Sequence, residues 1–107
     1  MNIVIFHNPN CGTSRNVVKI VKDAGYTPNI VKYLESGWST AQLQTLFATA
    51  GITAREALRV SKTPAEEMGL TRPDVTEQEL LEAMAAHPIL VDRPFVACRG
   101  KVHLCRP

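Results

Sequence analysis

The sequence has no long apolar run and no large excess of either charge. Its first apolar stretch, within MNIVIFHNP, is short and has no basic start, whereas a membrane helix needs about 20 apolar residues and a signal peptide begins with a basic segment. The formal net charge of +2 is too small to indicate nucleic-acid binding. We therefore expect a cytoplasmic protein that binds neither a membrane nor nucleic acid.

Cysteine is also scarce, and its spacing fits neither a disulfide framework nor a metal site. The chain has 3 cysteines, Cys11, Cys98 and Cys105, and an odd number argues against a secreted disulfide framework. Reduced thiols are typical of the cytoplasm. Together with the 3 histidines, these cysteines show no zinc-ligand spacing. We therefore predict no bound metal and structural roles for Cys98 and Cys105.

The first part of the chain predicts a β-α-β unit. Residues 2–6 are typical of a short buried strand, and apolar residues recur at helical spacing over 17–24 before Gly25, which ends the helix. Residues 29–34 are typical of a second strand. Two strands joined through a helix are expected to run parallel, with a right-handed crossover.

The middle of the chain carries four signals for the start of a helix. In each, a serine or threonine is followed three residues later by glutamine or glutamate, the pattern of a capping box. These signals begin at Ser39, Thr53, Thr63 and Thr76. The third has Pro64 at the first helical position and predicts a helix that ends near Gly69.

The last residues predict a β-hairpin and complete the fold. Residues 94–98 and 101–105 are strand-like and are separated by a two-residue turn, which pairs Cys98 with Lys101 and leaves Cys98 and Cys105 without a disulfide. The order βαβ, helical block, ββ hairpin predicts a thioredoxin-like α/β fold with a four-stranded mixed sheet. We expect a single domain over 1–107, with a helical insertion at about 39–86.

The thioredoxin-like plan normally closes with one more helix, and the sequence stops at Pro107 before such a helix. We therefore expect exposed apolar surface beside the first helix, which would favour dimerisation or lower stability.

Cys11 lies between the first predicted strand and the first predicted helix, in the segment HNPNCGTSRN at 7–16. The start of a helix presents unpaired N–H groups and the positive end of the helix dipole, which favour a thiolate and lower the thiol pKa. The loop after a strand is also where α/β sheets bind ligands. Its neighbours form loops, so we expect a reactive thiol rather than a small buried core residue.

The residues around Cys11 exclude two common kinds of thiol chemistry. Ser14 stands where a C-x-x-C motif has its second cysteine, so Cys11 has no local resolving thiol and needs an external one, such as glutathione. Position 18 is Val18 rather than the arginine of a C-x5-R phosphate-binding loop.

Several segments together resemble the glutaredoxin-linked arsenate reductase family, bacterial enzymes of thioredoxin fold. They are HNPNCGTSRN (7–16), YLESGW (33–38), REALR (55–59), EEMGL (66–70), HPILVDRPFV (87–96) and LCRP (104–107). They occur in this order and span essentially the whole chain.

The resemblance implies a site and a reaction. Cys11 would attack arsenate as the nucleophile, and His7 would help to hold it as a thiolate. Arg59, Arg93 and Arg106 would bind the oxyanion through charge-assisted bonds and stabilise the charge that develops during attack. Glutathione would attack the adduct as a co-substrate and glutaredoxin would reduce it, without a bound cofactor.

Four further residues, each close in sequence to one of these site residues or among them, allow more than one interpretation. Pro94 is the candidate for the cis proline that thioredoxin-like folds carry before the third strand, although a trans bond is the default. Arg15 would either cover the first turn of its helix or face the substrate. Ser14 is a further candidate site residue, and His7 could be an ordinary hydrogen-bonded histidine.

Two other functions compete with arsenate reduction. A related branch of the fold is a non-enzymatic regulator that binds RNA polymerase and senses redox state through a C-x-x-C pair, and Ser14 argues against that role. A glutathione-dependent thiol transferase would use Cys11 but would not need several arginines around one oxyanion. The arginines therefore favour arsenate reductase.

Overall fold

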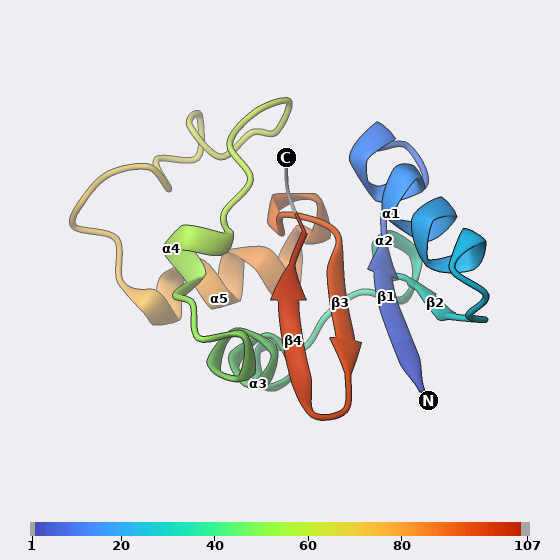
Figure 1. The fold of residues 1–107 in the computed structure, drawn as a ribbon. Coiled ribbons are helices and arrows are strands. Elements are labelled where there is room, and N and C mark those ends of the chain that lie inside the picture. Colours follow the sequence, from blue (N-terminus) through green and yellow to red (C-terminus); the bar gives the residue numbers. More distant parts are fainter. Residues whose placement is uncertain (1, 106–107) are drawn as a thin grey trace. The chain divides into compact units, whose positions relative to one another are not determined.

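The computed structural model describes residues 2–105, and the chain divides into two compact units (Figure 1). The first unit joins Met1–Ser36 to Arg93–Pro107, and the second is Gly37–Asp92. The first unit therefore combines the two ends of the sequence, and it holds the segment around Cys11.

The first unit contains a four-stranded sheet. Its elements are β1 (Ile3–His7), α1 (Gly12–Asp23), β2 (Asn29–Lys32), α2 (Tyr33–Ser36), β3 (Phe95–Cys98) and β4 (Lys101–Leu104). The strand order is β2-β1-β3-β4, with β1 parallel to β2 and antiparallel to β3 (Figure 1). This confirms the predicted mixed sheet and the thioredoxin-like α/β fold.

Strand β1 has alternating burial that places a functional side chain inside the unit. Ile3, Ile5 and His7 are buried, while the residues between them are only partly covered. Because successive side chains of a strand point to opposite faces, His7 shares the buried face with the two isoleucines. The strand thus ends with an imidazole at the start of the loop that leads to Cys11.

Helix α1 begins immediately after Cys11 and ends at Asp23, as its apolar spacing predicts. Ser14 is the one residue of α1 that is buried. Apolar side chains are exposed on α1 and beside it: Ile20 is 58% exposed, Tyr26 44% and Ile30 38%. This is the exposed apolar surface expected beside the first helix.

The hairpin closes the sheet as the sequence predicts. Cys98 pairs with Lys101, and the turn residues Arg99 and Gly100 have φ values of 53° and 74°. Two consecutive positive φ values are typical of the turn that matches the twist of a two-residue hairpin. Cys98 therefore lies opposite Lys101 and not opposite Cys105, and both cysteines are free thiols.

The second unit is helical. It contains α3 (Thr40–Ala50), α4 (Ala54–Ala57), α5 (Glu77–Ala86) and the 3-10 helix η1 (Pro88–Leu90). Both bonds of the capping box form at Ser39, Thr53 and Thr76, so three of the four predicted helix starts are confirmed. Leu43 and Phe47 of α3 and Leu80 and Met84 of α5 are buried in this unit.

The helix predicted to begin at Thr63 is wrong, because this segment forms turns. The Thr63 hydroxyl donates to the backbone carbonyl of Arg59 at 2.7 Å and lies 3.0 Å from that of Val60. It accepts from the N–H of Ala65 at 3.3 Å rather than from that of Glu66. A threonine that bonds its neighbouring backbone in this way competes with helix capping.

Residues 33 and 34 are a second departure from the predicted elements. The strand predicted to run to residue 34 ends at Lys32, and Tyr33 begins α2. Tyr33 is buried, at 1% exposure, so its side chain packs in the interior although the residue lies in a helix and not in the strand. None of the helices within residues 2–105 is long and apolar enough to cross a membrane.

Candidate active site

Cys11 is the N-cap residue of α1, with φ −106° and ψ 124°. Its backbone N–H donates to the carbonyl of Asn8 at 3.1 Å, and its carbonyl accepts the N–H of Arg15 at 3.0 Å. The residue is only 7% exposed, less than its loop-forming neighbours predict, because the loop folds inward and also buries Asn8. The sulfur therefore lies just below the surface at the amino end of a helix.

Arg93 reaches the same sulfur from the opposite end of the sequence. Its Nε–H donates to Cys11 Sγ at 3.0 Å, across a separation of 82 positions. Arg93 lies two residues before β3, and the Arg93–Pro94 peptide bond is cis, the alternative that the sequence leaves open beside the default trans bond. The carbonyl of Pro94 accepts the N–H of Cys105 at 2.9 Å.

The surroundings of Cys11 favour its ionised form. Burial is the largest influence and opposes ionisation, but it is outweighed by the backbone N–H of Ser14, by the hydrogen bond and charge of Arg93, and by the backbone N–H of Thr13. The pKa of the Cys11 thiol is therefore lowered from its ordinary value. The first-turn amides of α1 and the Arg93 side chain therefore act together to stabilise the thiolate.

His7 is bonded to the first turn of α1. Its Nδ1 lies 2.6 Å from the Oγ of Ser14, which also accepts the backbone N–H of Asn8 at 3.0 Å. Burial is the main cause that lowers the pKa of His7, and the positive charges of Lys32, Arg15 and Lys22 lower it further. The positive charge that contacts the sulfur is therefore that of Arg93.

The remaining arginines differ in how the structure places them. Arg15 Nη1 donates to the carbonyl of Pro9 in the loop before α1, at 2.8 Å. Arg59 follows α4 in the second unit, where its backbone N–H donates to the carbonyl of Leu90. Its Nε is buried and has no hydrogen-bond partner among residues 2–105. Arg106 lies outside the described residues.

The sequence prediction missed Asn8 as an organising residue of the site. Its side chain is buried at 3% exposure, and its Oδ1 accepts the backbone N–H of Asn10 at 2.9 Å. The only sequence signal was the Asn-Pro-Asn run, which is typical of a turn with an asparagine bonded to its own backbone.

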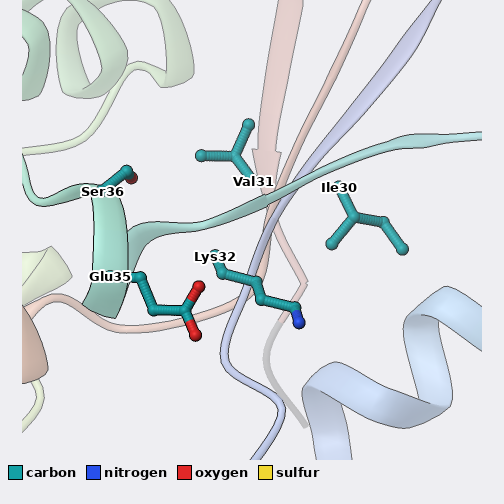
Figure 2. Close-up of a pocket in the computed structure, with 5 residues that line it drawn as sticks. All are labelled: Ile30, Val31, Lys32, Glu35 and Ser36. Atoms are coloured by element: carbon teal, nitrogen blue, oxygen red, sulfur yellow. The ribbon is translucent and has the colours of Figure 1, made fainter.

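A surface pocket lies away from these residues, at the free edge of the sheet. It is lined by Ile30, Val31, Lys32, Glu35 and Ser36, and Figure 2 shows Lys32 and Glu35 projecting to one side of β2 while Val31 points to the other. Neither Cys11 nor Arg93 lines it. Within the described part of the chain, no three His, Cys, Asp or Glu residues come close enough to hold a metal ion.

A mixed sheet of this order with one activated thiol at the first helix defines a thioredoxin-like thiol protein. The model of the ArsC family matches residues 6–107, and the chain belongs to that family. An arsenate reductase of Synechocystis is 50% identical over 105 residues, which cover 98% of this chain and 75% of the relative. An arsenate reductase of Rhizobium meliloti is 47% identical over 107 residues, which cover 100% of this chain and 76% of the relative.

Solved structures agree with this assignment. The arsenate reductase from Vibrio cholerae superposes with a TM-score of 0.94 at 34% identity, covering 100% of this chain and 92% of that one. A protein from Yersinia pestis described as a putative arsenate reductase gives a TM-score of 0.92 at 36% identity, covering 99% of this chain and 94% of that chain.

Proposed function

We propose that this chain is an arsenate reductase in which the Cys11 thiolate attacks arsenate. The observation that carries the proposal is the contact between Arg93 Nε and Cys11 Sγ, which joins a nucleophile to an oxyanion-binding side chain. Relatives at 47% and 50% identity that bear the name arsenate reductase support it.

In this proposal Arg59, Arg93 and Arg106 bind the arsenate oxygens. Arg93 lies against the nucleophile already, and its planar guanidinium group has the geometry that binds oxyanions. Arg59 has a buried Nε without a partner among residues 2–105, and a buried donor without an acceptor is costly. His7 acts with Cys11, through the first turn of α1.

The proposed reaction reduces arsenate to arsenite in four steps. The Cys11 sulfur forms a bond to arsenic, and one arsenate oxygen leaves as hydroxide and is protonated to water. A glutathione thiol replaces a further oxygen, again released as water. Reduced glutaredoxin then attacks the glutathione sulfur; a glutathione–glutaredoxin disulfide forms, and the electron pair of the broken sulfur–arsenic bond stays on arsenic, now As(III). Water displaces Cys11 and releases arsenite.

Glutathione is thus a co-substrate, glutaredoxin is the protein partner, and no bound cofactor is used. The lone Cys11 supports this dependence, because Ser14 occupies the position of a local resolving thiol. Both reductants are maintained in the cytoplasm, where we place the reaction. We treat the whole chain as one functional domain into which the helical segment at about 39–86 is inserted.

A coupled assay tests the proposal. Arsenate, glutathione, glutaredoxin and a regenerating reductase are supplied, and turnover is compared among wild type, Cys11→Ser, Arg59→Ala and the matched surface control Arg72→Ala. We expect no turnover for Cys11→Ser, a loss of about 100-fold for Arg59→Ala and near-normal turnover for Arg72→Ala. Turnover that survives in Cys11→Ser would overturn the proposal. Consumption of a glutathionylated peptide but not of arsenate would favour a thiol transferase.

A further inference from the structure

We propose that Ser14 is a positioning residue for the reactive thiol, because its buried hydroxyl ties the end of β1 to the first turn of α1 and so holds Cys11 Sγ against Arg93. The proposal rests on the proposed function only in treating Cys11 as the nucleophile. It assigns to Ser14 a role different from that of the second cysteine of a C-x-x-C motif, whose position it occupies.

The hydroxyl of Ser14 is fully buried, at 0% exposure. Its Oγ lies 2.6 Å from His7 Nδ1 and 3.0 Å from the backbone N of Asn8. Both partners belong to the end of β1 and the residue after it, whereas Ser14 belongs to α1. One side chain therefore bridges the two ends of the loop that carries Cys11.

Counting hydrogens fixes the direction of both bonds. A backbone N–H can only donate, so Ser14 Oγ is the acceptor toward Asn8. His7 Nδ1 is the one acceptor that the described residues offer to the single hydroxyl hydrogen, so we assign the hydroxyl as donor and Nδ1 as unprotonated. A doubly protonated imidazole would leave the Ser14 hydroxyl hydrogen buried without an acceptor, which is unfavourable. The network thus selects a neutral His7 with its proton on Nε2.

The charges around His7 act in the same direction. Lys32 on the neighbouring strand and Arg15 and Lys22 on α1 are the charged groups that influence it, and all are positive. Around Cys11 the charged group that acts on the thiol is Arg93, which lies before β3. Arg93 is therefore the cation that contacts the thiolate, and the histidine contributes through position.

The bridge encloses the contacts that set the sulfur in place. Inside it, the Cys11 N–H donates to the carbonyl of Asn8 at 3.1 Å, and Asn10 donates to the side chain of Asn8 at 2.9 Å. The backbone N–H groups of Ser14 and Thr13 stabilise the thiolate. Without the hydroxyl, the first turn of α1 is released from β1, and these amides and Arg93 lose their common alignment on the sulfur.

The test compares Ser14→Ala with Asn16→Ala, a control at an exposed position of the same helix that leaves the bridge intact. The rate of Cys11 alkylation by iodoacetamide is measured against pH, site by site, by mass spectrometry of the Cys11 peptide. We expect Ser14→Ala to raise the Cys11 thiol pKa, and the alkylation rate at pH 7 to fall about three- to tenfold. Asn16→Ala should leave both unchanged. A Ser14→Ala protein that is less stable but has an unchanged Cys11 pH profile would overturn the proposal.

A second measurement needs no substitution. Nitrogen NMR of the wild-type protein at pH 7 should show His7 as a neutral ring protonated on Nε2. A cationic ring, or a ring protonated on Nδ1, would overturn the proposal even if Ser14→Ala does not fold. Neither measurement uses arsenate. A negative result in the arsenate assay would therefore not count against the Ser14 bridge, and a negative result here would not count against arsenate reduction.

Discussion

Arg93 donates its Nε–H to the sulfur of Cys11 at 3.0 Å, although 82 positions separate the two residues in the chain. The contact forms because β3, which follows Arg93, pairs directly with β1, which leads to Cys11. The sheet topology thereby places a guanidinium group beside a thiolate at the amino end of α1.

Replacing Arg93 should weaken both the thiolate and the reaction. In Arg93→Ala the hydrogen bond and the charge are both lost, so the Cys11 thiol pKa should rise and arsenate turnover should fall about 10²–10³-fold. Arg93→Lys is the matched comparison, since it keeps the charge and loses the fork; it should give an intermediate thiol pKa and intermediate turnover. Equal alkylation profiles for wild type and Arg93→Ala would contradict the assigned role of the contact.

The thiols should react with an alkylating reagent in a defined order. The pKa of Cys11 is lowered by its surroundings despite its burial, whereas burial raises the pKa of Cys105. Because the thiolate is the reactive form, limited iodoacetamide at pH 7 should label Cys11 before Cys105. Peptide mapping by mass spectrometry over time would measure this, and preferential labelling of Cys105 would contradict it.

The stability of the protein should fall as the pH is lowered through the range in which an exposed histidine titrates. Burial and nearby positive charges lower the pKa of His7 in the folded state, so the unfolded chain, with a histidine pKa of about 6.5, binds the proton more readily. The contribution of the neutral His7 to the free energy of unfolding is therefore present above about pH 6.5 and is lost as the pH falls below that value. Urea unfolding at pH 7.0 and pH 5.5 measures the difference. His7→Gln should show a smaller difference than wild type, and an equal difference would show that His7 is not its source.

The capping box of α3 offers a test of stability away from the site. The Ser39 side chain accepts the N–H of Gln42 at 3.1 Å, so Ser39→Ala should lower the free energy of unfolding by about 1 kcal/mol. Ser39→Asp retains an acceptor and should cost little. Urea denaturation of both variants measures the effect, and Cys11 alkylation serves as the control, because it should not change.

Much of the fold was predictable, since it depends on local chemistry. The capping boxes at Ser39, Thr53 and Thr76 require only residues three positions apart, and the hairpin requires only a turn that tolerates positive φ at Arg99 and Gly100. Thr63 has the same local pattern, but its hydroxyl bonds the carbonyl of Arg59 instead. A sequence pattern cannot decide between two backbone partners that are equally near in the chain.

The site was predictable only in part. The position of Cys11 before a helix followed from the sequence, whereas Arg93 was a candidate through the family resemblance alone, because only the folded sheet brings it near. The bridge from Ser14 to His7 and Asn8 had no sequence signal beyond three common polar residues. The role of this bridge depends on the complete burial of Ser14 and on the direction of each hydrogen bond, and the sequence alone predicts neither.

The pairing of β1 with β3 has a consequence for the synthesis of the protein. All of Gly37–Asp92 is translated between the two strands, and that unit is continuous in the chain, so its contacts can form while the ribosome is still at work. Cys11 emerges early but acquires its arginine only when the last residues of the sheet have been made. The nascent chain therefore lacks the contact between Arg93 and Cys11 until translation has passed residue 98.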